Sequence, residues 1–173
     1  MEGKWSACLI RRLNLTSLQA VIRNFWRNEF ELPTAADFAH YIPAAADRVR
    51  AVNDGGHFPD GVNKLDFGRG FERSRWNEIV LSNMCTKILE ARQEEDGWGL
   101  PNVSDDYLLG MLQGHLKRSR QAWAKAQCKF SPALGRVETE EEAQERLAQS
   151  EASRYASILS RTHRSQVSFL SRP

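Results

Sequence analysis

The spacing of apolar residues predicts two long amphipathic helices in the middle of the chain. The first runs from residue 74 to about 95, and its apolar side chains recur every three or four residues over more than one face. The second runs from 104 to about 127, with one apolar stripe. The main apolar contributors to the expected core are Trp76, Ile88, Leu112, Leu116 and Trp123.

Polar residues mark where the helices begin. Ser74 and Ser104 stand at cap positions of the two long helices, and two aspartates in the first turn of the second suit the helix dipole. Thr139 followed by Glu142 is a capping-box pattern that begins a third, mostly polar helix. No convincing strand pattern is present. The expected fold class is therefore all-α, a small irregular helical domain built on two long amphipathic helices with a polar C-terminal helix.

The N-terminal part of the chain has shorter helical patterns and a long loop. Apolar residues at helical spacing predict a short helix that ends before Pro33. Residues 44–52 are alanine-rich and favour a second short helix. From there to Gly70, glycines and turn residues predict a loop whose aromatic side chains hold it against the core.

These patterns divide the chain into three regions. Residues 1–70 form an N-terminal helical region with a loop, 71–130 a helical core with a basic second helix, and 131–173 a charged C-terminal helix with a disordered tail. The chain has 173 residues, of which 41% are hydrophobic and 27% charged, as in an ordinary globular protein. The sequence leaves open whether the first region packs on the core or forms a subdomain of its own.

Cysteine usage and hydropathy favour an intracellular protein. Cys8, Cys85 and Cys128 lie far apart without CxxC spacing, which is typical of reduced thiols. The first residues lack the apolar run of a secretory signal, and no apolar run approaches the roughly 18 residues that span a bilayer. We expect a nuclear or cytoplasmic protein without membrane association.

The chain lacks the motifs of the common enzyme classes. The triplet Asp66-Phe67-Gly68 matches the metal-binding triplet of protein kinases, but no glycine-rich loop or HRD segment accompanies it, which favours coincidence. The four histidines are not grouped with one another or with cysteines at zinc spacing. His115 lies on an apolar stripe, where a partly buried histidine bonded to a carbonyl is favoured over a ligand or base. We expect no enzymatic activity, no metal and no cofactor.

The most distinctive feature of the sequence is a stretch from Tyr107 to Val137 that contains no acid. The formal net charge of the chain is only +2, yet this stretch carries six basic residues: Lys117, Arg118, Arg120, Lys125, Lys129 and Arg136. Positive potential accumulates where no acid intervenes, so these residues are predicted to bind the phosphates of a nucleic acid. The alternative is a solvated face, because the helix dipole alone favours cations near a helix C-terminus.

The stretch from Arg75 to Gln127 resembles a family of DNA-binding domains. It contains Trp76 at the start of an amphipathic helix, then Gly97-Trp98-Gly99, then a basic helix from Leu116 to Trp123. This order is similar to the Myb/SANT-like, trihelix-type domains of transposon-derived proteins, which read DNA with their last, basic helix. Residues 76–166 also resemble a group of uncharacterised multicopy fungal proteins associated with mobile elements. The first resemblance implies DNA binding; the second implies no particular activity.

Two functional hypotheses follow from the sequence. The first is non-enzymatic DNA binding through the basic helix, in a protein derived from a mobile element. The second is a helical interaction module, in which the broad face of the helix at 74–95 or the charged C-terminal helix meets a protein partner or a second copy of the chain. A mobile-element remnant without a retained activity is a further alternative. The same amphipathic helices serve either function, so the sequence does not separate them.

Overall fold

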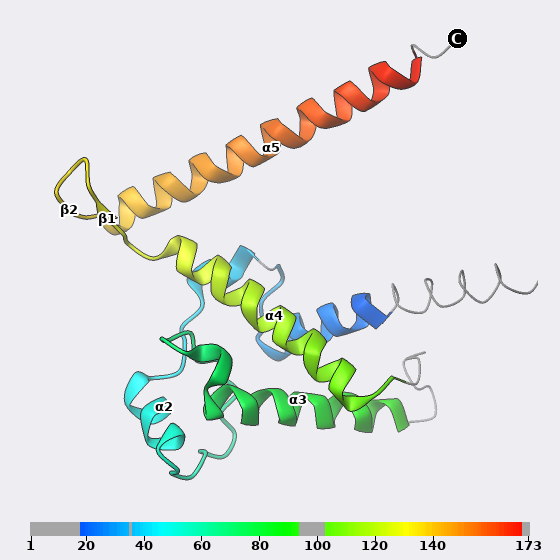
Figure 1. Ribbon diagram of the computed structural model, residues 1–173, viewed down its shortest axis with the longest axis vertical. Helices are drawn as coiled ribbons and strands as arrows, with labels where there is room; N and C mark the ends of the chain where they lie inside the picture. Colours follow the sequence, from blue (N-terminus) through cyan, green and yellow to red (C-terminus); the bar gives the residue numbers. More distant parts are fainter. Residues whose placement is uncertain (1–17, 35, 94–102, 171–173) are drawn as a thin grey trace, which may run out of the picture. The chain divides into compact units, whose positions relative to one another are not determined.

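The structure is a computed structural model that describes residues 18–34, 36–93 and 103–170, with the backbone alone at 92–93 and 162–170 (Figure 1). Residues 18–29 are helical and are called helix 18–29 below. The elements that follow are η1 (Ala36–His40), α2 (Ala46–Asn53), η2 (Phe71–Arg73), α3 (Arg75–Gln93), α4 (Asp105–Ala126), β1 (Phe130–Ser131), β2 (Arg136–Val137) and α5 (Glu140–Leu170). The fold is all-α, as predicted.

The chain divides into two compact units, Met1–Ala122 and Trp123–Pro173. Helix α4 begins in the first unit, and its last turn belongs to the second. The sequence patterns had suggested divisions at residues 70 and 130. The described residues up to 70 lie in the same unit as α3.

The core of the first unit lies along α3. Trp76, Val80, Met84 and Ile88 of this helix are each at most 1% exposed, so its broad apolar face is covered within the chain. Helix 18–29, η1, the loop before η2 and α4 contribute the side chains that surround it: Leu18, Ile22, Trp26, Phe38, Leu65, Phe67, Leu108, Leu112 and Leu116. Burial of these apolar side chains is the main force that holds the elements together.

Trp123 departs from the predicted core. Trp76, Ile88, Leu112 and Leu116 are buried, as predicted, whereas Trp123 has intermediate exposure. This residue is the first of the second unit, near the end of α4. The apolar stripe of α4 therefore continues past the part of the helix that the core of the first unit covers.

Two of the predicted helix caps form as expected. The hydroxyl of Ser104 accepts a hydrogen bond of 3.3 Å from the backbone N–H of Tyr107 in the first turn of α4. At the start of α5, Thr139 Oγ1 accepts from the N–H of Glu142 at 3.3 Å, and the Glu142 carboxylate accepts from the N–H of Thr139 at 2.8 Å. This reciprocal pair is the predicted capping box.

The cap of α3 comes from another element. Ser74 precedes the helix as predicted, but its hydroxyl donates to Asn53 Oδ1 at 3.3 Å instead of accepting from the backbone. The same amide oxygen of Asn53 accepts from the N–H of Trp76 at 3.2 Å. A free donor in the first turn of α3 is thus satisfied by the last residue of α2.

The loop before η2 is held against α3 by one tryptophan and one asparagine. Trp76 Nε1–H donates to the carbonyl of Lys64 at 2.6 Å, and its ring lies 4.6 Å from that of Phe58. The buried amide of Asn77 accepts from the N–H of Asp66 at 2.9 Å and donates to the Asp66 carbonyl at 2.8 Å. The aromatic residues of the loop do pin it to the core, as predicted.

The kinase-like triplet has a structural explanation. Asp66 is buried, and its carboxylate accepts a hydrogen bond of 2.7 Å from the N–H of Gly68 two residues later. Such a local bond is a common way for aspartate to shape a turn. Together with the bonds to Asn77, it places Asp66 and the buried Phe67 against α3.

The second unit consists of a small hairpin and α5. Its two strands pair antiparallel over two residues each, and Gly135 turns the chain with a φ of 65°. The sequence did not predict this hairpin, because two residues per strand leave no alternation to detect. Helix α5 continues to Leu170, into the segment where a disordered tail had been expected.

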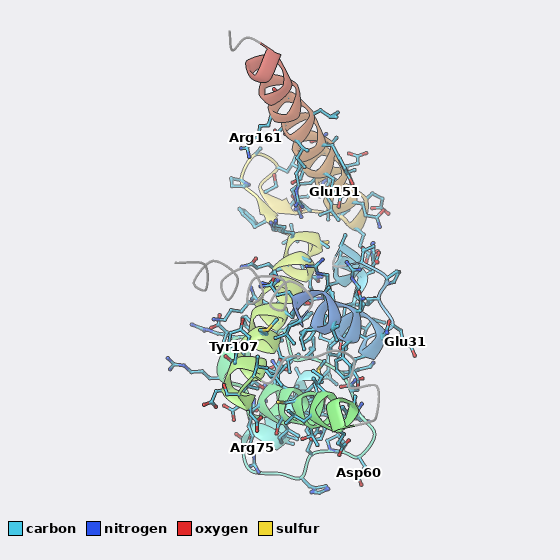
Figure 2. All side chains as sticks on the ribbon, turned by 90° about the vertical axis from the view of Figure 1, so that its right-hand side faces the viewer. Glu31, Asp60, Arg75, Tyr107, Glu151 and Arg161 are labelled. Carbon is cyan, nitrogen blue, oxygen red and sulfur yellow. The ribbon has the colours of Figure 1, made fainter. Side chains whose placement is uncertain are left out.

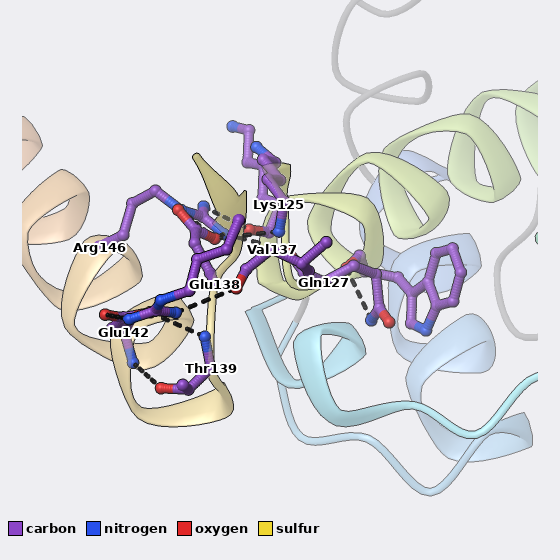
Figure 3. A network of polar contacts seen from close by, with 10 residues as sticks. Lys125, Gln127, Val137, Glu138, Thr139, Glu142 and Arg146 are labelled. Carbon is purple, nitrogen blue, oxygen red and sulfur yellow. Dashed lines mark hydrogen bonds and ion pairs between the residues drawn. The ribbon is translucent and has the colours of Figure 1, made fainter. Parts of the chain in front are cut away.

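One arginine links the parts of the second unit (Figure 3). The guanidinium of Arg146 on α5 donates to the carbonyls of Lys125 at 2.7 Å and Gln127 at 3.0 Å, where α4 ends. It also donates to the Glu138 carboxylate at 2.9 Å, just after β2. Next to it, the guanidinium of Arg136 makes a two-pronged contact with Glu142. The first turns of α5 are therefore fixed to the hairpin and to the end of α4.

Candidate functional site

The six basic residues predicted to bind nucleic acid fall in both units. Lys117, Arg118 and Arg120 belong to the first unit, whereas Lys125, Lys129 and Arg136 belong to the second. Their partners within the chain also differ, and those partners decide how much positive charge each residue offers to a ligand.

Three of the six contact other described residues through their side chains, whereas Lys129 uses its backbone N–H, which donates to the Glu138 carboxylate at 3.1 Å. Lys117 forms an ion pair with Glu72 at 3.0 Å, and both side chains are about half exposed. Arg120 lies over the ring of Phe71, 5.1 Å from its centroid. Arg136 binds Glu142 through two nitrogens, at 2.9 and 2.7 Å. Lys125 and Lys129 are exposed.

Arg118 faces a hollow in the first unit. This hollow of about 570 Å³ lies between helix 18–29 and α4, with η1 at one side. We call it the arginine hollow, and it is lined by Gln19, Arg23, Trp26, Arg27, Phe38, Gly110, Met111, Gly114, His115, Arg118 and Ser119. No acidic residue is among the described residues that line it.

The helical repeat explains how three arginines meet at this hollow. Arg23 and Arg27 are four residues apart and therefore lie on the same face of helix 18–29. On α4, the guanidinium of Arg118 lies over Gly114, 3.6 Å from the point where a Cβ would stand. Gly110 and Gly114 present no side chain of their own, so they leave the side of the hollow formed by α4 open.

An aromatic pair forms the base of the arginine hollow. Trp26 is buried, and its ring stacks on that of His115 with centroids 5.5 Å apart and planes at 28°. Its indole N–H donates to the hydroxyl of buried Ser119 at 3.1 Å. A rigid aromatic residue with a satisfied polar atom thus fixes helix 18–29 to α4, and with it the position of the arginines.

The electrostatics of the hollow are dominated by the arginines. Burial, followed by the charges of Arg118, Arg23 and Arg27, lowers the pKa of His115 to about 4. The imidazole is therefore neutral at pH 7, and the three guanidinium groups remain charged. No ion pair joins any of them to a carboxylate within the described parts of the chain. The Nε of Arg27 is buried without a hydrogen-bond partner among the described residues.

This arrangement is suited to an anion. Guanidinium groups bind phosphate and carboxylate oxygens through paired N–H donors, and a buried N–H without a partner gains a bond when an acceptor arrives. Among the described lining residues, the imidazole of His115 stacks on Trp26, and the hydroxyl of Ser119 accepts a hydrogen bond from the Trp26 indole. The chemistry that the three arginines support is the binding of an anion.

Two of the three arginines were missed by the sequence reasoning. Arg23 and Arg27 lie about ninety positions before Arg118 in the sequence. The predicted site was drawn from the single basic stretch between Tyr107 and Val137, which does not include them. A local signal was present: Gln19, Arg23 and Arg27 recur every fourth residue on a helix whose other face is apolar. Such a polar stripe identifies one face of a helix, but it does not show which other element lies opposite that face.

Two other classes of site were sought in the described residues. Among them, no helix is both long and apolar enough to cross a membrane. The same part of the chain has no group of three or more His, Cys, Asp or Glu side chains suited to a metal ion.

Comparisons of the chain with protein-family models, with curated proteins and with solved structures found no match. The resemblances to Myb/SANT-like domains and to mobile-element proteins therefore remain expectations from the sequence. One of the segments on which the first depends, Gly97-Trp98-Gly99, lies outside the described residues.

Proposed function

We propose that the protein binds nucleic acid through phosphate groups and that one phosphate occupies the arginine hollow. The observation that carries this proposal is the convergence of Arg23, Arg27 and Arg118 on a hollow whose described lining holds no acidic residue. The unpartnered Nε of Arg27 supplies a donor already turned away from water. Bound phosphate would gain charge-assisted hydrogen bonds there.

A polymer of phosphates fits the surroundings better than a single small anion. Lys117 is next to Arg118 in the sequence and is exposed. Its ion pair with Glu72 is exposed as well, and pairs of this kind contribute at most about 1 kcal/mol, so a phosphate can replace the carboxylate. Further basic residues follow along the chain without an intervening acid, up to Arg136. Within the first unit, Lys117 would therefore meet a phosphate next to the one held in the hollow.

The experiment is a titration of a labelled random-sequence DNA duplex, followed by fluorescence anisotropy at about 50 and 200 mM salt. If about four phosphates are contacted, the affinity falls roughly 150-fold between these conditions. The triple variant Arg23→Gln, Arg27→Gln, Arg118→Gln should bind at least about tenfold more weakly, with a salt slope smaller by about 1.

A matched control separates the hollow from net charge. The triple variant Arg48→Gln, Arg50→Gln, Arg69→Gln removes the same charge from exposed positions on α2 and in the loop before η2. It should retain nearly the affinity of the wild type. Equal weakening by both triple variants, with thermal unfolding unchanged, would show that only net charge matters. Absence of binding by the wild type at low salt would refute the proposal.

Competition tests the chemical class of the ligand. Polyglutamate serves as a carboxylate competitor that stands for an acidic protein surface, and unlabelled duplex serves as the phosphate competitor. If the hollow reads phosphate, unlabelled duplex should displace the label at far lower charge concentration than polyglutamate. Equal displacement would favour an acidic protein as the partner.

A further inference from the structure

Beyond its first turns, the described part of α5 is largely exposed. Every residue from 148 to 161 is exposed, including Tyr155 at 69%, Leu159 at 70% and Ile158 at 49%. Figure 2 shows side chains such as Glu151 and Arg161 projecting from this part of the helix. Most of the stability of a helix in a protein comes from packing of an apolar face, so this face is suited to a partner.

The exposed segment carries an apolar stripe with coiled-coil spacing. Ala148, Ala152, Tyr155 and Leu159 are separated by steps of four, three and four residues, and so lie along one seam of the helix. The opposite side of the same segment carries serines at positions 150, 153, 157 and 160, together with Arg154 and Arg161. An apolar seam with a polar opposite side, and with Ile158 at its flank, is suited to pairing with one other helix.

We propose that α5 pairs with α5 of a second copy of this chain, in antiparallel orientation. The sizes of the seam residues favour this direction. With the centre of the pair between Ser153 and Arg154, Ala148 faces Leu159 of the partner subunit, and Ala152 faces the partner's Tyr155. Each small side chain then meets a large one, which fills the interface evenly. A parallel pair would set large against large and leave a gap between the alanines.

Charge favours the same direction. Residues 140–151 contain five glutamates and one arginine, whereas 156–167 contain two arginines and no acid. The antiparallel register places these two segments opposite one another, so unlike charges meet across the pair. A parallel pair would place the acidic segments side by side, at a cost of like-charge repulsion. The overlap covers residues 140–167, about 40 Å of helix at about 1.5 Å per residue.

The first experiment is sedimentation equilibrium of the full chain over a wide range of concentrations. The average mass should rise to twice that of the monomer. The variant Tyr155→Glu, Leu159→Glu should remain monomeric at all concentrations. The control Ser150→Glu, Ser157→Glu adds the same charge on the opposite face and should still pair. A wild type that stays monomeric throughout, as when α5 folds onto its own chain, would overturn the proposal, and so would equal loss of pairing in both variants.

The second experiment tests direction by disulfide formation. In a background with Cys8→Ser, Cys85→Ala and Cys128→Ser, the variants Ala148→Cys and Leu159→Cys are oxidised separately and as a mixture. An antiparallel pair brings position 148 next to 159 of the other copy, so the mixed disulfide should dominate. Position 148 is far from its own equivalent in this register, beyond disulfide reach. Efficient linkage of Ala148→Cys to itself, without mixed product, would overturn the antiparallel register. Circular dichroism of each variant verifies that the helices form.

Discussion

His115 lies between Trp26 and the guanidinium groups of the arginine hollow, so its charge is linked to folding. Its pKa is lowered from 6.5 to about 4, first by burial and then by the charges of Arg118, Arg23 and Arg27. Between pH 6.5 and about 4, the unfolded chain binds a proton at this imidazole that the folded chain does not. The free energy of unfolding therefore falls as the pH falls through this window, and is unaffected by His115 above it.

His115→Gln should remove part of this pH dependence. Because His115 is only partly buried and solvent screens part of the effect, we expect the stability difference between wild type and variant to change by about 1–2 kcal/mol between pH 7 and pH 4. Urea denaturation at both pH values measures it. His57→Gln, at an exposed loop position, is the control and should follow the wild type. If the two variants respond identically to pH, the proposed linkage is wrong.

Single residues also show what the sequence could reveal. The capping box of Thr139 and Glu142 was predicted because both partners lie within one turn of the chain. The cap that Asn53 provides to α3, and the approach of Arg23 and Arg27 to Arg118, depend on which elements pack together. Residue spacing within one helix carries no information about which other element the helix contacts. The sequence therefore indicated one partner of each contact but not the other.

The amphipathic pattern predicted where each helix lies more accurately than it predicted how deeply each residue is buried. Helices α3 and α4 lie within a few residues of their predicted limits, because their periodicity is long and regular. The same periodicity continued to Trp123, which nevertheless is only partly buried. An apolar stripe indicates which side of a helix faces the core. The elements that pack against the helix determine how much of that stripe is buried.

Two substitutions on α4 test this distinction. Leu112 is completely buried, so Leu112→Ala should lower the free energy of unfolding by about 2–5 kcal/mol. Trp123→Ala removes a larger side chain, but from a partly exposed position, and should cost about 1–2 kcal/mol. Urea denaturation gives both values. A cost for Trp123→Ala equal to or above that of Leu112→Ala would mean that this tryptophan is buried in solution.

The two units of the chain differ in how their helices are supported. Helix α3 buries a broad apolar face against other elements of the first unit, whereas every residue from 148 to 161 of α5 is exposed. Amide exchange depends on local opening, which is easy where few buried contacts must break. Amides at 148–161 should therefore exchange at least about a hundredfold faster than those of α3 in dilute protein.

Hydrogen exchange followed by mass spectrometry measures both regions in one experiment. Raising the protein concentration should slow exchange at 148–161 without changing exchange in α3, because pairing protects only the exposed helix. Protection at 148–161 that is strong and independent of concentration would contradict this expectation, since it would mean that the chain covers its own helix.

The bond from Asn53 to the first turn of α3 has a consequence for how the protein folds. Helix α3 carries many of the core side chains, and its first turn is capped by Asn53, more than twenty positions earlier in the sequence. Until α2 is docked, that first turn lacks an acceptor and frays. The end of α2 and the start of α3 are therefore expected to become structured in the same kinetic step. Both would belong to one folding nucleus, although a long loop separates them in the sequence.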